Sequence, residues 1–108
     1  MIPVPKGFYF AALEAGFRYT QRKDLGLILS QYPAQASGVF TRNVFQAAPV
    51  LVARELLSAK KQMRGILVNS GQANACTGTK GILNCRKTLD LVAGQLNLDP
   101  SSVFPAST

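Results

Sequence analysis

The spacing at which hydrophobic residues recur changes along this chain, and each change predicts the start of a new helix or strand. Residues 8–12, Phe-Tyr-Phe-Ala-Ala, alternate between two faces as the residues of a strand do. Residues 14–16, Glu-Ala-Gly, can form a turn, and residues 17–20 can return as a second strand. The pattern therefore predicts a β-hairpin in this first segment.

Two further strands are predicted before the first helix. The apolar run over residues 25–30 is interpreted as a short strand that ends at Tyr32-Pro33. Residues 36–41 are a weaker candidate, because Gly38 lies inside them. Four strands are therefore expected ahead of any helix.

The middle of the chain predicts a helix followed by a strand. The helix covers residues 48–57, with Pro49 near its start and the cations Lys60 and Lys61 just past its end. A strand over residues 50–53 is the alternative, because β-branched residues gather there. Residues 65–68, Gly-Ile-Leu-Val, are then expected to form a buried strand that is covered on both faces.

A second helix has the most regular pattern of the chain. Its apolar residues recur at steps of three and four, which places them on one helical face: Ile82, Cys85, Leu89, Val92 and Leu96. Thr77 or Thr79 can cap its start, and the segment 97–100, which closes with a proline, should stop it. A final short strand is predicted over residues 102–104.

The stretch N-S-G-Q-A-N-A-C-T-G, Asn69–Gly78, joins the predicted buried strand to this second helix. An ordinary connection needs about 2 to 6 residues, and ligands gather where a strand's carboxyl end meets a helix's amino end. The amides of Asn69, Gln72 and Asn74 could equally stabilise the loop itself. Because the stretch holds no titratable acid or base, we interpret it as a scaffold that shapes the wall of a site.

Composition indicates one folded domain. The chain has 108 residues, of which 47% are hydrophobic and 16% charged. No apolar run approaches the ~20 residues that cross a bilayer, and the first residues do not resemble a signal peptide, so a cytoplasmic location without membrane contact is expected. Cys76 and Cys85 form no disulfide framework and have no histidine to complete a zinc site. We expect buried thiols and no metal.

The formal net charge of +7 raises the question of an anionic partner. Lysine and arginine neutralise phosphates, so a nucleic-acid-binding module is one hypothesis. The basic residues are scattered along the chain, however, and no basic run carries interleaved aromatic residues. The preferred interpretation is solvated charged faces, which also leaves room for a small anionic substrate.

Several motifs occur in order over essentially the whole chain. They are Pro5-Lys6-Gly7-Phe8, Gly38-Val39-Phe40-Thr41, Ala47-Ala48-Pro49-Val50, the stretch from Val68 to Gly78, and Ala106-Ser107-Thr108. Together they resemble the N-terminal part of the ornithine acetyltransferase (glutamate N-acetyltransferase) family of arginine biosynthesis. The resemblance implies an α/β fold built as a layered sandwich of β-sheets and helices. It also implies that residues 1–108 are one incomplete N-terminal portion of the α chain.

The resemblance implies an enzyme whose precursor cuts itself before a threonine, which becomes the N-terminal nucleophile of a β chain. That threonine carries its own base in its α-amine. The acetyl group passes from N-acetylornithine to the threonine and then to glutamate. No cofactor is implied, and acetyl-CoA is a possible second donor. The expected partners are the rest of the α chain and the β chain, in a higher-order oligomer of α/β pairs without nucleic acid.

The resemblance also assigns site residues. Thr108 matches the family's oxyanion-hole threonine, and Asn69, Ser70, Gly71 and Asn74 belong to a structural loop near the site. The family pattern continues past Thr108 with a glycine and later with the nucleophile, so these 108 residues alone are expected to be inactive and to expose apolar surface to a partner. A nucleic-acid-binding module and a stand-alone interaction domain are the alternative functions.

Overall fold

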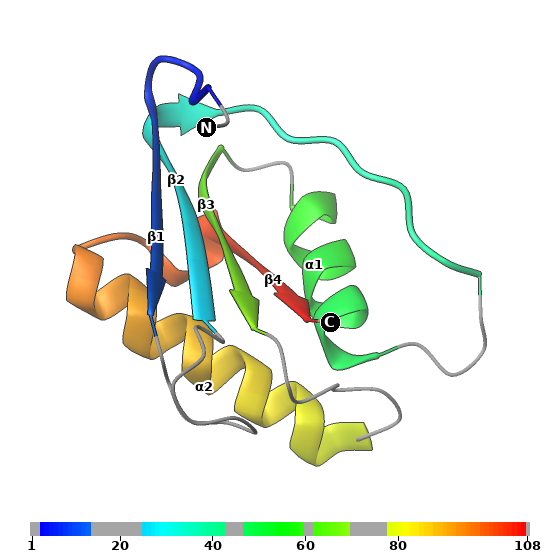
Figure 1. The fold of residues 1–108 in the computed structure, drawn as a ribbon. Coiled ribbons are helices and arrows are strands. Elements are labelled where there is room, and N and C mark those ends of the chain that lie inside the picture. Colours follow the sequence, from blue (N-terminus) through cyan, green and yellow to red (C-terminus); the bar gives the residue numbers. More distant parts are fainter. Residues whose placement is uncertain (1–2, 14–24, 43–46, 60–61, 70–77, 108) are drawn as a thin grey trace.

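The computed structural model describes residues 3–13, 25–42, 47–59, 62–69 and 78–107. In this part of the chain four strands form one mixed sheet in the order β1-β2-β3-β4 (Figure 1). The strands β1 (Phe8–Leu13), β2 (Leu25–Ala34) and β3 (Met63–Asn69) pair antiparallel. The last strand, β4 (Val103–Ser107), pairs parallel with β3.

Two helices pack on one face of this sheet, which we call the covered face (Figure 1). They are α1 (Ala48–Ser58) and α2 (Gly78–Leu96). The core consists of side chains that both helices and the two parallel strands contribute, namely Ala48, Val52, Leu56, Met63, Leu67, Cys85, Leu89 and Val103. The α/β layering predicted from the sequence is therefore present, and the described residues form one sheet and one helical layer.

The predicted helix 48–57 is confirmed, and the alternative strand over residues 50–53 is wrong. Pro49 occupies the first turn, where its missing N–H costs nothing, and the residues that α1 buries recur at helical spacing: Ala48, Pro49, Val52, Ala53 and Leu56. The β-branched Val52 is 1% exposed. Burial of this stripe in the core outweighs the local β preference of the segment.

The second helix is confirmed, with one change in its buried stripe. Cys85 and Leu89 are buried, but Ala93 is the fully buried residue of the last turns and Leu96 is 36% exposed. The helix ends where it was expected to end. Asn97 adopts φ 55°, and the N–H groups of Asn97 and Leu98 donate to the carbonyls of Gly94 and Ala93, which caps the carboxyl end.

A capped 3₁₀ turn leads from α2 into the last strand. Its residues are Pro100–Ser102, and Asp99 Oδ1 accepts hydrogen bonds from the N–H and the hydroxyl of Ser101 at 2.9 and 2.8 Å. The predicted strand over residues 102–104 is therefore displaced toward the carboxyl end, because Ser102 belongs to this turn and β4 begins at Val103.

The opposite side of the sheet, which we call the open face, carries no helix in the described residues. Large apolar side chains point to it from three strands: Phe8, Phe10, Ile28 and Ile66. Phe10 is 54% exposed and Ile66 is 37% exposed. The prediction that β3 is covered on both faces is thus wrong, and the predicted exposed apolar surface is present.

The strand predictions before α1 need three corrections. The partner of β1 is β2, with Leu13 opposite Leu25, while residues 17–20 lie outside the described residues. The second strand does not end at Tyr32-Pro33 but continues to Ala34. Residues 36–41 form no strand, so two strands precede the first helix in the described part of the chain.

An irregularity explains why β2 runs past its proline. The register between β2 and β3 shifts between Leu29 and Ala34. At this point the guanidinium of Arg64, on β3, donates to the carbonyls of Ser30 and Gln31 at 2.9 and 3.0 Å. A side chain from the neighbouring strand therefore supplies hydrogen bonds where the regular ladder is interrupted.

Candidate functional site

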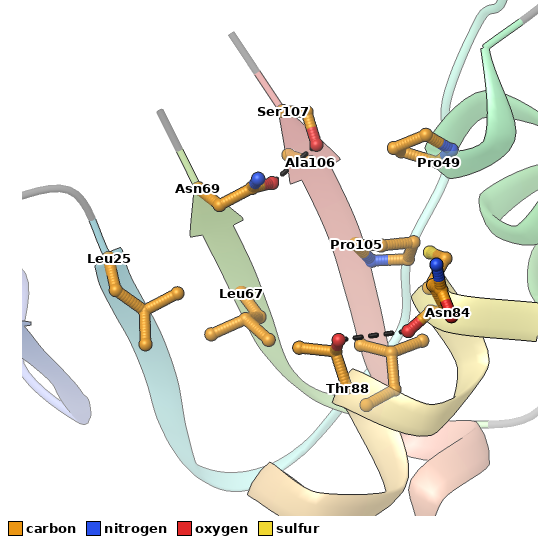
Figure 2. Close-up of a pocket in the computed structure, with 11 residues that line it drawn as sticks. Leu25, Pro49, Leu67, Asn69, Asn84, Thr88, Pro105, Ala106 and Ser107 are labelled. Carbon is orange, nitrogen blue, oxygen red and sulfur yellow. Dashed lines mark hydrogen bonds between the residues drawn. The ribbon is translucent and has the colours of Figure 1, made fainter. Parts of the chain in front are cut away.

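The candidate site lies where the two parallel strands end together. Asn69, the last residue of β3, is in register with Ser107, the last residue of β4. The Ser107 hydroxyl donates a hydrogen bond to Asn69 Oδ1, as Figure 2 shows. Both side chains are partly buried. The carboxyl ends of parallel strands are a common place for ligands in α/β proteins.

A pocket of about 240 Å³ opens beside this pair, between the covered face and the two helices. Asn69, Ser107, Asn84 and Thr88 give it polar groups (Figure 2). Its remaining wall is mostly apolar and is built by Leu25, Pro49, Leu67, Cys85, Leu89, Pro105 and Ala106. A hollow with an apolar wall and a few polar groups can hold and orient a small molecule.

The groups lining this pocket suit binding better than proton transfer. Burial raises the pKa of the Cys85 thiol, and the nearby Arg86 opposes this only in part, so the thiol stays uncharged and is a poor nucleophile. The Thr88 hydroxyl is already engaged, since it donates to the Asn84 carbonyl at 2.9 Å. Among the described residues, no group of three or more His, Cys, Asp or Glu side chains converges to hold a metal ion.

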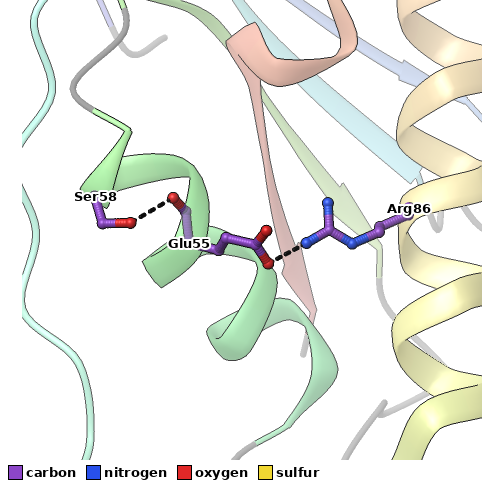
Figure 3. Close-up of polar contacts among 3 residues, drawn as sticks. All are labelled: Glu55, Ser58 and Arg86. Atoms are coloured by element: carbon purple, nitrogen blue, oxygen red, sulfur yellow. Dashed lines mark hydrogen bonds and ion pairs between the residues drawn. The ribbon is translucent and has the colours of Figure 1, made fainter.

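The two helices that wall the pocket are joined by an ion pair on the surface. The Arg86 guanidinium on α2 donates to the Glu55 carboxylate on α1, and the Ser58 hydroxyl donates to the Glu55 carbonyl at 2.8 Å (Figure 3). The Glu55 and Arg86 side chains are 69% and 39% exposed. Such an exposed pair adds little stability, and the buried contacts of Val52, Leu56, Cys85 and Leu89 hold the helices together.

The structure describes only some of the residues that the sequence predicted for the site. Asn69 is described, and it is the end of a strand as well as the start of the loop. Ser70, Gly71, Gln72, Asn74 and Thr108 lie outside the described residues, as does Cys76. The predicted burial of Cys85 is confirmed. Ser107 was not singled out as a site residue, although it directly precedes Thr108 in a recognised motif.

No helix among the described residues combines the length and the apolar character needed to cross a bilayer.

The fold is an α/β fold with a pocket at the ends of two parallel strands, which is a candidate small-molecule site. Comparison with known families makes this specific: the sequence model described as the ArgJ family matches residues 9–108. The chain belongs to this family. The prediction of the family from the motifs is thereby confirmed.

Two relatives show the degree of similarity. The chain is 60% identical over 104 residues to the arginine biosynthesis bifunctional protein ArgJ of Nitratidesulfovibrio vulgaris, covering 96% of this chain and 26% of that protein. It is 45% identical over 106 residues to the protein of the same name from Thermotoga neapolitana, covering 97% of this chain and 26% of that protein. The chain thus spans about a quarter of the length of these relatives.

Solved structures agree with the fold. The chain is similar to ornithine acetyltransferase from Mycobacterium tuberculosis in complex with ornithine, with a TM-score of 0.88, 35% identity and coverage of 96% of this chain and 57% of that chain. The arginine biosynthesis bifunctional protein ArgJ from Bacillus halodurans gives a TM-score of 0.87 at 33% identity, covering 94% of this chain and 53% of that chain. The predicted α/β fold of the ornithine acetyltransferase type is confirmed.

Proposed function

We propose that these 108 residues serve as the N-terminal part of an acetyltransferase that moves an acetyl group from N-acetylornithine to glutamate in arginine biosynthesis. The observation that supports this most strongly is the likeness to a protein named ornithine acetyltransferase and solved with ornithine. Neither alternative, the nucleic-acid-binding module or the stand-alone interaction domain, is favoured by an observation on the described residues.

The proposal includes a catalytic role for Thr108 in stabilising negative charge. Ser107 lies at the carboxyl end of β4 and lines the pocket, and Thr108 is the next residue of the chain. When a nucleophile attacks the acetyl carbonyl, charge develops on the carbonyl oxygen. A hydroxyl and a backbone N–H held beside that oxygen stabilise the charge where water is excluded. We assign the hydroxyl to Thr108 and the N–H to a following glycine.

The nucleophile in this proposal is a threonine of a second chain that self-cleavage of one precursor exposes. Its α-amine takes the hydroxyl proton, the hydroxyl oxygen attacks the acetyl carbonyl, and the amine of ornithine leaves with a proton. The amine of glutamate then attacks the acetyl-threonine ester and restores the hydroxyl. Acetyl-CoA would serve as an alternative donor for the first step. The rest of the α chain, the β chain and an oligomer of such pairs, in the cytoplasm, belong to the same proposal.

The test is a chimaera that carries these residues. Residues 1–108 replace the matching segment of the Nitratidesulfovibrio vulgaris relative, whose 60% identity favours correct packing, and transfer from N-acetylornithine to glutamate is measured. We expect an active enzyme in which Thr108→Ala lowers turnover by roughly 10² to 10³, the usual loss for one such donor, with little change in KM.

The Ser58→Ala variant is the control, because it removes an exposed hydroxyl that donates to the Glu55 carbonyl of the same helix and does not line the pocket. It should keep full activity. A folded, correctly cleaved Thr108→Ala enzyme with unchanged turnover would exclude Thr108 from the mechanism. A folded chimaera without any transfer activity would contradict the proposed function as a whole.

A further inference from the structure

We propose that the hydrogen bond between Ser107 and Asn69 is a positioning device for Thr108, and that Asn69 and Ser107 therefore set turnover without stabilising the charge themselves. This inference rests on the proposed function, in which Thr108 stabilises the developing negative charge. It adds Asn69 and Ser107 to that function and assigns both of them the task of holding Thr108 in place.

Ser107 is the last residue of a short strand at the edge of the sheet. In the described residues β4 is five residues long and forms the edge of the sheet, with β3 as its only neighbour. Pro105, two residues before Ser107, has no N–H to give to the ladder. A side-chain hydrogen bond at the last paired position therefore matters more here than in the middle of a sheet.

The hydrogen bond between Ser107 and Asn69 lies at the wall of the pocket. Asn69 and Ser107 are in register, face the same side of the sheet and line the pocket between the sheet and the helices (Figure 2). Both are partly buried, so water competes less for their hydrogen bond than at an exposed site. The bond connects the last residues of two strands that are 38 positions apart in the chain.

Thr108 follows Ser107 directly in the sequence. Consecutive Cα atoms are about 3.8 Å apart, so a shift of the Ser107 backbone would be passed on to Thr108. A group that stabilises a transition state must be held to within about 0.5 Å, and a displacement of about 1 Å can cost about 10² in rate. Loosening Ser107 should therefore reduce the benefit of the Thr108 hydroxyl.

The prediction is a loss in kcat that depends on Thr108. In the active chimaera, Ser107→Ala should lower kcat by up to about 100-fold, the cost of a displacement of about 1 Å, while KM changes by less than about twofold. Ser107→Thr keeps the hydroxyl and should restore most of the turnover. Ser107→Cys has a side chain of similar size, but its thiol is a weak hydrogen-bond donor. Its kcat should therefore lie between those of Ser107→Ala and Ser107→Thr.

The decisive measurement is a double-mutant cycle. If Ser107 acts through Thr108, Ser107→Ala should cause almost no further loss of kcat in the Thr108→Ala enzyme. The same relation is expected for Asn69→Ala. The Ser58→Ala control should leave kcat unchanged, and circular dichroism and melting temperature identify folded variants. If Ser107→Ala does not fold, Ser107→Cys takes its place in the cycle.

The possible outcomes separate this inference from the proposed function. Unchanged kcat in folded Ser107→Ala contradicts the positioning role, and so does an equal loss with and without the Thr108 hydroxyl. Both results would leave the acetyltransferase proposal standing. Wild-type turnover in Thr108→Ala would instead contradict the charge-stabilising role on which the inference depends. A raised KM at unchanged kcat would make Ser107 and Asn69 substrate-binding groups and would overturn positioning.

Discussion

The two faces of the sheet carry similar side chains in very different surroundings. On the covered face, Val103 is 0% and Leu67 5% exposed beneath the two helices. On the open face, Phe10 and Ile66 belong to the same sheet and are as apolar, yet both stay accessible to solvent. The sequence of a strand therefore shows which faces of the sheet are apolar. Which of these faces is buried within the described residues depends on where the helices pack.

The largest effect should come from the covered face. Leu89, on α2, is 3% exposed and part of the core, so Leu89→Ala leaves a cavity between α2 and the sheet. We expect a loss of about 2 to 5 kcal/mol in the free energy of unfolding, measured by urea denaturation of the chain. Leu91→Ala on the exposed side of the same helix is the matched control. Equal losses for the two would show that the core lies elsewhere.

A smaller effect is expected from a polar side chain on the open face. Arg64→Ala removes the two hydrogen bonds to the Ser30 and Gln31 carbonyls where the ladder is irregular. We expect a loss of about 1 to 3 kcal/mol by the same measurement. Arg64→Lys keeps the charge but replaces the planar guanidinium, which donates to both carbonyls, with a single ammonium group. This variant should therefore recover only part of the lost free energy of unfolding. Full recovery would show that charge, not the paired hydrogen bonds, stabilises this region.

The smallest effect is expected from the apolar part of the open face. Phe10→Ala should change the stability of the chain by no more than about 1 kcal/mol, because more than half of the side chain is already in water. The same Phe10→Ala substitution can be made in the chimaera. A much larger loss in the free energy of unfolding there than in the chain would show that other residues bury the open face. A loss in the chain as large as that of Leu89→Ala would contradict the distinction between the two faces.

The sequence pattern correctly predicted the elements that are determined by interactions between residues close in the chain, above all α2. The second helix follows from its apolar period, and its end follows from Asn97 and the proline after it. The segment 36–41 could not be judged in this way, because a strand needs a partner. Instead of joining the sheet, this segment runs toward α1, where Arg54 donates to the Thr41 carbonyl at 3.0 Å and lies over the Phe40 ring.

The candidate site was predicted in part for the same reason. Asn69 was identified because an unusual polar stretch follows an apolar strand, which is visible in the sequence. Ser107 was missed because its significance depends on strand register, which brings it to Asn69 across 38 residues. The role of Thr108 comes from the family resemblance and stays a prediction.

The parallel pairing of β4 with β3 has a consequence for the order of folding. The β2 and β3 pairing and the β1 and β2 pairing are antiparallel, whereas β4 reaches β3 only after the chain has passed through the whole of α2. Gly65 pairs with both Leu29 and Val103, which lie similarly far from it in the sequence. Loop length therefore does not distinguish the two pairings, but parallel pairings form slowly. We therefore expect β4 to be protected from hydrogen exchange late in refolding, so that the strand leading to Thr108 becomes ordered only on a scaffold that is already built.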